Sequence, residues 1–280
     1  MFDFNMSVQT NANGRVLLCA HRGVSSANIP CNTMAAFKAA LAQKADIIEL
    51  DVSISTDGVY YVFHPGMESP HLGKKKLLSL MPSKKIEKRR FMNQDDTPTE
   101  YGIEKLEDVL DFLKGKCYIN VDKFWTDIPG IADIIRKCGV EKQVIVKTPL
   151  QKIYFDKISA YAPEFMYMPI IRGTDKVTDM LLTKQLNYIG AEVCFSKETD
   201  QVAQDSYIQE MHKKGLLLFS NAIVYDYKEV LSAGHSDDAS IINSPDFGWG
   251  WLANKGYDII QTDWCGMARH YFVENGIGGY

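Results

Sequence analysis

Residues 47–64 read I-I-E-L-D-V-S-I-S-T-D-G-V-Y-Y-V-F-H, and this stretch decides the fold. It begins with a short apolar run interrupted only by two acidic residues, which is typical of a strand buried in an α/β protein. The remainder alternates β-forming residues around Asp57-Gly58, the strongest short-range signal for a β-hairpin. We therefore expect a buried strand over Ile47–Val52 and a hairpin that grows from its end.

Similar apolar runs recur along the chain and are separated by segments long enough for a helix. One such segment carries Ile131, Ile134 and Ile135 at helical spacing. Alternating strands and helices indicate a parallel sheet, because parallel strands need a crossover connection. The other strands that we expect are Val16–Ala20, Cys117–Val121, Gln143–Val146, Phe165–Ile170, Ala191–Phe195, Leu216–Phe219 and Asp258–Gln261.

Eight strand–helix units in 280 residues fit a (β/α)8 TIM barrel, with a doubly wound sheet as the alternative. We expect residues 1–280 to form a single barrel domain. A small insertion of approximately residues 53–99 follows the second strand, where the hairpin breaks the alternation.

The composition is that of a globular protein, with 46% hydrophobic and 24% charged residues. A net charge of −4 argues against a nucleic-acid partner, because phosphate binding needs a basic excess. Apolar runs fall far short of the ~18 residues of a membrane span, so we expect no stable membrane insertion. The first residues lack the apolar core of a signal peptide, which predicts a cytoplasmic protein, or a periplasmic or secreted one if a signal peptide has been removed. The sequence leaves the oligomeric state open.

The hairpin brings candidate catalytic residues together. If Asp57-Gly58 is a two-residue turn, Asp51 pairs with His64, and Glu49 shares their face because side chains alternate along a strand. Leu50 then points toward the helices. This spacing predicts a cluster of Glu49, Asp51 and His64.

Polar residues also follow the other strands, and the sites of α/β barrels lie at the carboxyl ends of their strands. Acids, cations and a histidine therefore converge on one mouth. Carboxylates without nearby thiols suit a hard cation such as Mg²⁺ or Ca²⁺. The alternative is a pair of buried carboxylates held by salt bridges to Arg or Lys. The residues in question are His21-Arg22-Gly23, Glu49, Asp51, Asn120, Asp122, Lys123, Lys147, Glu192, Asn221 and Asp263.

Four consecutive motifs resemble the glycerophosphodiester phosphodiesterase family. They read A-H-R-G at 20–23, N-T-M-A-A-F-K-A-A-L at 32–41, A-D-I-I-E-L-D-V at 45–52 and T-D-G-V-Y-Y-V-F-H at 56–64. Y-I-N-V-D-K at 118–123 and G-Y-D-I-I-Q-T-D at 256–263 are similar to two later strands of that family. The resemblance spans nearly the whole chain and implies the same barrel with its insertion.

The resemblance implies a role for seven residues. Glu49, Asp51 and Asp122 correspond to the ligands of one divalent cation, His21 and His64 to the catalytic histidines, and Arg22 and Lys123 to the residues that contact the phosphate. Three positions depart from the family pattern. Cys31 stands where the family has Glu, Pro65 stands where it has Asp, and the third ligand, Asp122, is one methylene shorter than the usual Glu.

We therefore expect a metal-dependent phosphodiesterase that hydrolyses small glycerophosphodiesters to glycerol 3-phosphate and an alcohol. One histidine would take a proton and the other would give one. The alternatives are a phospholipase-type cleavage of a lipid headgroup through a cyclic phosphate and a non-catalytic binder of phosphorylated polyols. An exposed apolar loop would favour the phospholipase, and Leu77–Met81 is the candidate.

The insertion also carries a basic segment. Residues 74–90 hold eight Lys and Arg and one Glu, a charge of +7. We expect this segment to be exposed near the barrel mouth and to attract the anionic substrate. The alternative is a solvated surface without a role in binding.

Overall fold

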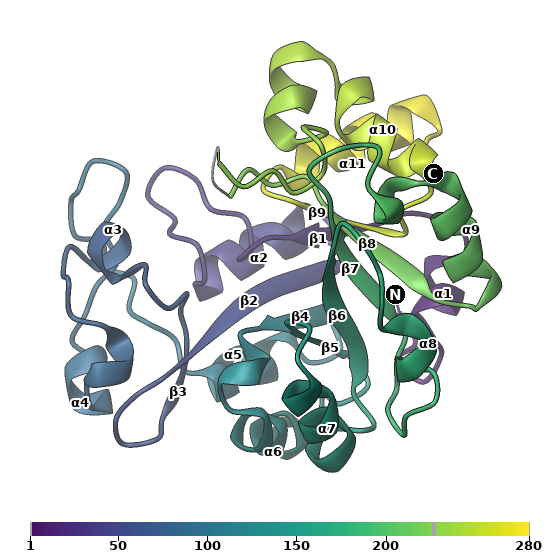
Figure 1. Ribbon diagram of the computed structural model, residues 1–280. Helices are drawn as coiled ribbons and strands as arrows, with labels where there is room; N and C mark the ends of the chain where they lie inside the picture. The colour runs from purple at the N-terminus through teal and green to yellow at the C-terminus, as the bar shows by residue number, and fades with distance from the viewer. Residues whose placement is uncertain (1, 226–227, 280) are drawn as a thin grey trace.

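The computed structural model describes residues 2–225 and 228–279 and contains a closed barrel of parallel strands (Figure 1). The strands are hydrogen-bonded in the order β1-β9-β8-β7-β6-β5-β4-β2, and β1 also pairs with β2, which closes the ring. This confirms the TIM barrel over the doubly wound sheet. The barrel strands are β1 Leu17–Ala20, β2 Ile47–Ile54, β4 Tyr118–Asp122, β5 Val144–Thr148, β6 Met166–Arg172, β7 Gly190–Cys194, β8 Leu217–Asn221 and β9 Ile259–Thr262.

Helices follow the strands and cover the outside of the barrel. Local signals set their ends: the Thr33 hydroxyl accepts from the Ala36 N–H at the start of α2, and Gly139 ends α6 in the left-handed conformation. Outside the insertion the helices are α1 Val8–Ala12, which precedes β1, and α2 Met34–Ala42, α5 Leu106–Leu113, α6 Ile128–Cys138, α7 Lys152–Tyr161, α8 Thr178–Leu181, α9 Asp205–Lys213, α10 Trp249–Lys255 and α11 Cys265–Asn275. Among the described residues, no helix is long and apolar enough to cross a membrane.

Two apolar layers hold the barrel together. The larger layer lies between strands and helices and includes Leu50, as the alternation of β2 predicts. A smaller cluster with Cys19, Tyr118 and Phe219 belongs to the opposite faces of the same strands. Polar residues on those inward faces, such as Glu49 and Asn120, are therefore surrounded by protein rather than by solvent.

The hairpin forms, but its predicted register is wrong by one residue. Strand β3 (Tyr60–Val62) runs antiparallel to β2, and Val52 pairs with Val62. The turn contains three residues rather than two: the Gly58 N–H donates to the Ser55 carbonyl, and Gly58 adopts φ +79° as the additional residue. Asp51 therefore lies opposite Phe63, whose N–H donates to the Asp51 carbonyl oxygen at 2.9 Å.

The rest of the insertion packs around a small core of its own. Two short helices, α3 (Glu68–Leu72) and α4 (Ser83–Ile86), lie beside the barrel at the left of Figure 1. In the candidate loop, Leu78 and Met81 are buried, whereas Leu77 and Leu80 are exposed. The core consists of Tyr61, Phe63, Leu72, Leu78, Met81, Ile86, Phe91 and Ile103.

Candidate active site

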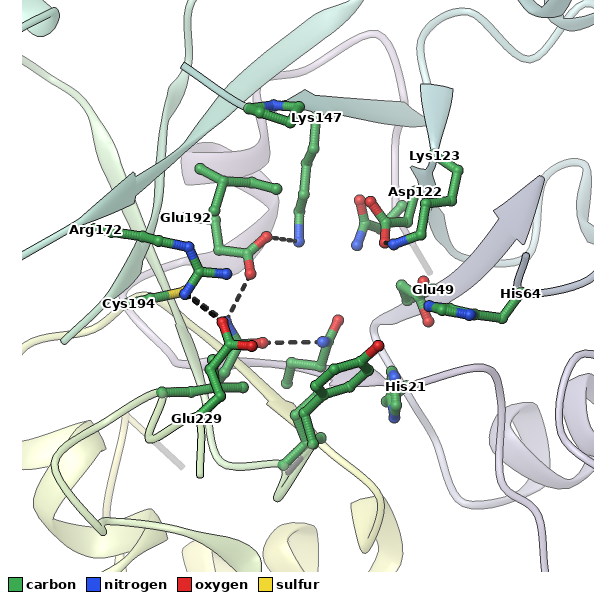
Figure 2. Close-up of a pocket in the computed structure, with 18 of the residues that line it drawn as sticks. His21, Glu49, His64, Asp122, Lys123, Lys147, Arg172, Glu192, Cys194 and Glu229 are labelled. Atoms are coloured by element: carbon green, nitrogen blue, oxygen red, sulfur yellow. Dashed lines mark hydrogen bonds and ion pairs between the residues drawn. The ribbon is translucent and has the colours of Figure 1, made fainter. Parts of the chain in front are cut away.

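A cavity of about 470 Å³ opens at the carboxyl ends of the barrel strands (Figure 2). Its volume falls within the range of roughly 300–1,000 Å³ that is usual for small-molecule sites. In Figure 2, His21, Glu49, His64, Asp122 and Lys123 lie at the right, and Arg172, Glu192 and Glu229 lie at the left. None of the eight basic residues of 74–90 lines this cavity, so their role in substrate attraction stays a prediction.

Three carboxylates meet on one wall of the cavity. Each of Glu49, Asp51 and Asp122 offers an oxygen, and these oxygens lie within 4.8 Å of one another. Strand register explains the arrangement, because Asp51 on β2 is paired with Asp122 on β4 and Glu49 lies two residues earlier on the same face. The structure thus brings together the three acids that the family resemblance implies as metal ligands.

These carboxylates are buried at some cost. The Arg22 N–H donates to Glu49 Oε2 at 2.7 Å, yet burial and the neighbouring Asp51 raise the pKa of Glu49 to about 8. Burial opposes ionisation of Asp122 too, but Lys123, whose Nζ lies 2.8 Å from Asp122 Oδ2, holds the pKa of Asp122 below its usual value. Only part of the negative charge is thus neutralised by side chains.

Whether the cluster fits a cation can be judged from the carboxylate oxygens that lack a hydrogen-bond partner. Asp51 Oδ1 and Asp122 Oδ1 are buried and accept no hydrogen bond from any described residue. Buried acceptors are normally satisfied, and close oxygen donors without thiols are what Mg²⁺ and Ca²⁺ prefer. The donor set therefore fits one divalent cation.

His21 follows β1 and is oriented by a residue distant in sequence. Its Nδ1 lies 2.9 Å from Asp263 Oδ1, just after β9. Burial disfavours the charged imidazolium, yet this hydrogen bond and the charge of Asp263 raise the pKa of His21 above its usual value. His21 is thus held in one orientation and inclined to carry a proton.

His64 lies beside the carboxylates despite the shifted register. Its Nε2 is 3.9 Å from Asp51 Oδ1. Strand β3 ends at Val62, so the chain is free to turn His64 toward the cavity. Burial and the nearby cations lower the pKa of His64, against the opposing charge of Asp51.

The two predicted phosphate-binding residues flank the carboxylates. Arg22 Nε is 3.0 Å from Asp51 Oδ2, and Lys123 Nζ is 3.9 Å from Asp51 Oδ1. Both line the cavity. Both also have positive φ values, 55° and 59°, which place each residue in a sharp bend after its strand.

Sequence reasoning missed residues that support this wall. The Asn32 side chain donates to Asp51 Oδ2 at 2.8 Å and accepts from the Asp51 N–H at 3.3 Å. Its place directly before the α2 cap residue Thr33 was the available signal, because Asn readily adopts the left-handed conformation seen here, φ 56°. Cys31, a departure from the family pattern, lies with Sγ 3.8 Å from His71 Nδ1, and burial raises the pKa of its thiol to about 11.

The fold and the site define a (β/α)8 barrel with a carboxylate cluster and two histidines at its mouth. Solved structures share this architecture. A glycerophosphoryl diester phosphodiesterase from Parabacteroides distasonis superimposes with a TM-score of 0.78 at 20% identity, covering 94% of this chain and 88% of that one. An Oleispira antarctica phosphodiesterase in complex with its product sn-glycerol-3-phosphate gives a TM-score of 0.69 at 15% identity, over 92% and 97% of the two chains.

Curated sequences give the same family name. A probable glycerophosphodiester phosphodiesterase 2 of Mycobacterium tuberculosis is 28% identical over 134 residues, which are 48% of each chain. A glycerophosphodiester phosphodiesterase of Caldanaerobacter subterraneus is 52% identical over 50 residues, 18% of this chain and 20% of the relative. The chain thus matches at most about half the length of these relatives. A family profile described as a domain of unknown function matches residues 167–272.

The resemblance to the glycerophosphodiester phosphodiesterases is therefore confirmed. The chain has the fold of this family over nearly its whole length, and its relatives and structural neighbours are phosphoric diester hydrolases.

Proposed function

We propose that the protein hydrolyses glycerophosphodiesters to glycerol 3-phosphate and an alcohol. The observation that carries this proposal is the meeting of Glu49, Asp51 and Asp122 with His21 and His64 at the mouth of the barrel. A phosphodiester is anionic and resists nucleophiles, so its hydrolysis needs charge compensation and proton transfer at one place. This wall of the cavity offers both.

Glu49, Asp51 and Asp122 would hold one divalent cation, Mg²⁺ or Ca²⁺. When bound, the cation would offset the negative charge that builds on the phosphoryl oxygens in the transition state. Arg22 and Lys123 would contact the same oxygens. Arg22 forms an ion pair with Asp51, and Lys123 forms one with Asp122. These ion pairs hold the two basic side chains at the edge of the carboxylate cluster before substrate arrives.

The two histidines would move the protons. His64, whose lowered pKa favours the neutral ring, would take a proton from the attacking water as its oxygen bonds to phosphorus. His21, whose raised pKa favours the charged ring, would give a proton to the alcohol oxygen as the bond from phosphorus to that oxygen breaks. Attack by a neighbouring substrate hydroxyl, yielding a cyclic phosphate first, would use the same two groups.

Variants of the histidines test this proposal. With glycerophosphocholine, glycerophosphoethanolamine and glycerophosphoinositol as substrates, His21→Ala and His64→Ala should each lower kcat by about 10²–10⁴-fold. The matched control is His270→Ala, because the side chain of His270 is 76% exposed on α11. EDTA should abolish the wild-type activity and added Mg²⁺ or Ca²⁺ should restore it. Near-normal turnover by either histidine variant, with circular dichroism unchanged, would refute the assignment of proton transfer.

A further inference from the structure

The cavity has a second polar wall that the proposed chemistry does not use. It comes from strands β4 to β8 and from lining residues after β8, and Figure 2 shows Arg172, Glu192 and Glu229 on the side away from His21 and His64. The lining residues after β8 are Ile223, Tyr225, Glu229 and Leu231. Both walls bound the same cavity, so a diester whose phosphate contacts the first wall would place one of its two alcohol groups against the second.

A fixed hydrogen-bond chain forms the base of this wall. Lys147 Nζ lies 2.6 Å from Glu192 Oε2 and 3.5 Å from the centre of the Phe219 ring, and Lys147 is only 2% exposed. The Asn221 amide donates to Glu192 Oε1 at 2.7 Å and accepts from Gln261 Nε2 at 2.9 Å. Each carboxylate oxygen can accept a second hydrogen bond and Lys147 has further N–H donors, so these residues, which all line the cavity, can bind additional polar groups.

Asn120 supplies an independent sign that this part of the cavity binds a polar group. It is fully buried, it lines the cavity, and neither its Oδ1 nor its Nδ2 has a hydrogen-bond partner among the described residues. Strand β4 lies between β2 and β5, so Asn120 sits between the carboxylate cluster and Lys147. A buried amide that lacks both partners is costly, and one hydroxyl group could satisfy its donor and its acceptor together.

The charges of this wall disfavour a cationic alcohol such as choline. Glu192 is paired with Lys147, and Glu229 with Arg172 at 2.7 Å, so both carboxylates are neutralised. Recognition of a quaternary ammonium needs unpaired negative charge or a cage of aromatic rings. Among the lining residues described, Trp125 lies 5.1 Å from Lys123 Nζ and the Tyr225 ring lies 6.3 Å from the ring of His64, a proposed catalytic residue, so these rings form no aromatic cage on this wall. Apolar side chains between the polar groups, such as Ile170 and Ile223, suit the C–H faces of a ring.

We propose that this wall binds the leaving alcohol of the diester and selects a polyhydroxylated one, a sugar or a cyclitol, over an amino alcohol such as choline. Cleavage of such a diester rests on the proposed function, whereas binding of the free alcohol to this wall does not. The alternating donors and acceptors of Asn120, Lys147, Glu192 and Asn221 match adjacent hydroxyl groups, each of which both donates and accepts.

Substrate preference and binding test the inference separately. The wild-type kcat/KM for glycerophosphoinositol should exceed that for glycerophosphocholine by at least about tenfold, because each unmet buried hydrogen bond costs that order of discrimination. Free myo-inositol should bind the metal-free protein in saturation-transfer NMR, and choline should not. A preference for glycerophosphocholine would overturn the inference and leave the proposed hydrolysis intact. If no diester is cleaved, the proposed function is wrong. The binding test is independent of this result, and absence of myo-inositol binding would refute the subsite.

A charge variant sharpens the test. Arg172→Met removes the guanidinium group that pairs with Glu229. Because both side chains are exposed, the fold should tolerate the change. The preference should then shift toward glycerophosphocholine by about tenfold, since the wall acquires a net negative charge. The matched control is Arg136→Met, which breaks an exposed pair with Glu164 away from the cavity. An equal shift in both variants, or none in Arg172→Met, would contradict the assignment.

Asn120→Leu removes both unpartnered amide atoms without exposing a buried charge. It should lower kcat/KM for glycerophosphoinositol and the NMR signal of myo-inositol by about tenfold, with cation binding in calorimetry unchanged. Loss of cation binding in this variant would show that Asn120 serves the carboxylate cluster and would overturn its place in the subsite.

Discussion

Binding of a divalent cation should release a proton from Glu49, and the structure sets the size of the effect. Burial and the charge of Asp51 raise the pKa of Glu49 to about 8, so the carboxyl is mostly protonated at neutral pH in the absence of a cation. A cation requires the ionised form, because ligands must be deprotonated. Glu49 should therefore release about 0.9 proton per cation at pH 7 and about 0.1 at pH 9.

The affinity should follow the same titration. Below pH 8 the apparent association constant should fall about tenfold for each pH unit, and above pH 8 it should become level. The same pKa also fixes the direction in which the folding stability of the cation-free protein changes with pH. An acid whose pKa is higher in the folded state than its ordinary 4.5 binds more protons when folded, so stability falls as the pH rises from about 4.5 to 8.

Isothermal titration calorimetry with Ca²⁺ in two buffers of different ionisation enthalpy measures the released protons directly. Histidines near the site contribute to the total, so the decisive quantity is the difference from Glu49→Gln, which cannot release this proton. That variant should bind more weakly and release about 0.9 proton fewer at pH 7. Equal proton release by the wild type and Glu49→Gln would refute the argument that burial holds this carboxyl protonated.

Two further predictions concern the insertion and the fold. Replacement of Lys74, Lys75, Lys76, Lys84 and Lys85 by Ser should lower kcat/KM at low ionic strength and leave kcat nearly unchanged. The dependence of kcat/KM on salt should also become flatter, because salt screens long-range attraction. Identical salt profiles for the variant and the wild type would identify the segment as a solvated surface. Gly23→Ala should lower the free energy of unfolding in urea by roughly 1–3 kcal/mol, because Gly23 has φ +78° and an added Cβ would lie 2.8 Å from the Ala36 carbonyl carbon. Gly115→Ala, with a similar φ of +74° but nothing within 4 Å, is its control, and an equal loss in both would exclude the contact with Ala36 as the cause.

Most of the barrel was predictable because its signals are local. Each strand is an apolar run whose length and bounding residues are written in the sequence, and all eight expected strands lie within a few residues of their observed positions. Polar residues at the ends of parallel strands must meet at one mouth, so the strand pattern predicts that acids converge there. The family motifs single out Glu49, Asp51 and Asp122 among them, and the structure brings these three together.

Tertiary structure decided what depends on distances between distant segments. The hairpin register turned on one additional residue at Gly58, because Asp-Gly signals the commoner two-residue turn but Gly can also serve as the left-handed residue of a three-residue turn. The hydrogen bond between His21 and Asp263 joins residues 242 positions apart, and the pair of Lys147 and Glu192 joins two barrel strands that are not adjacent. Such contacts exist only once the barrel closes, because ring closure, not local preference, sets which side chains share its interior.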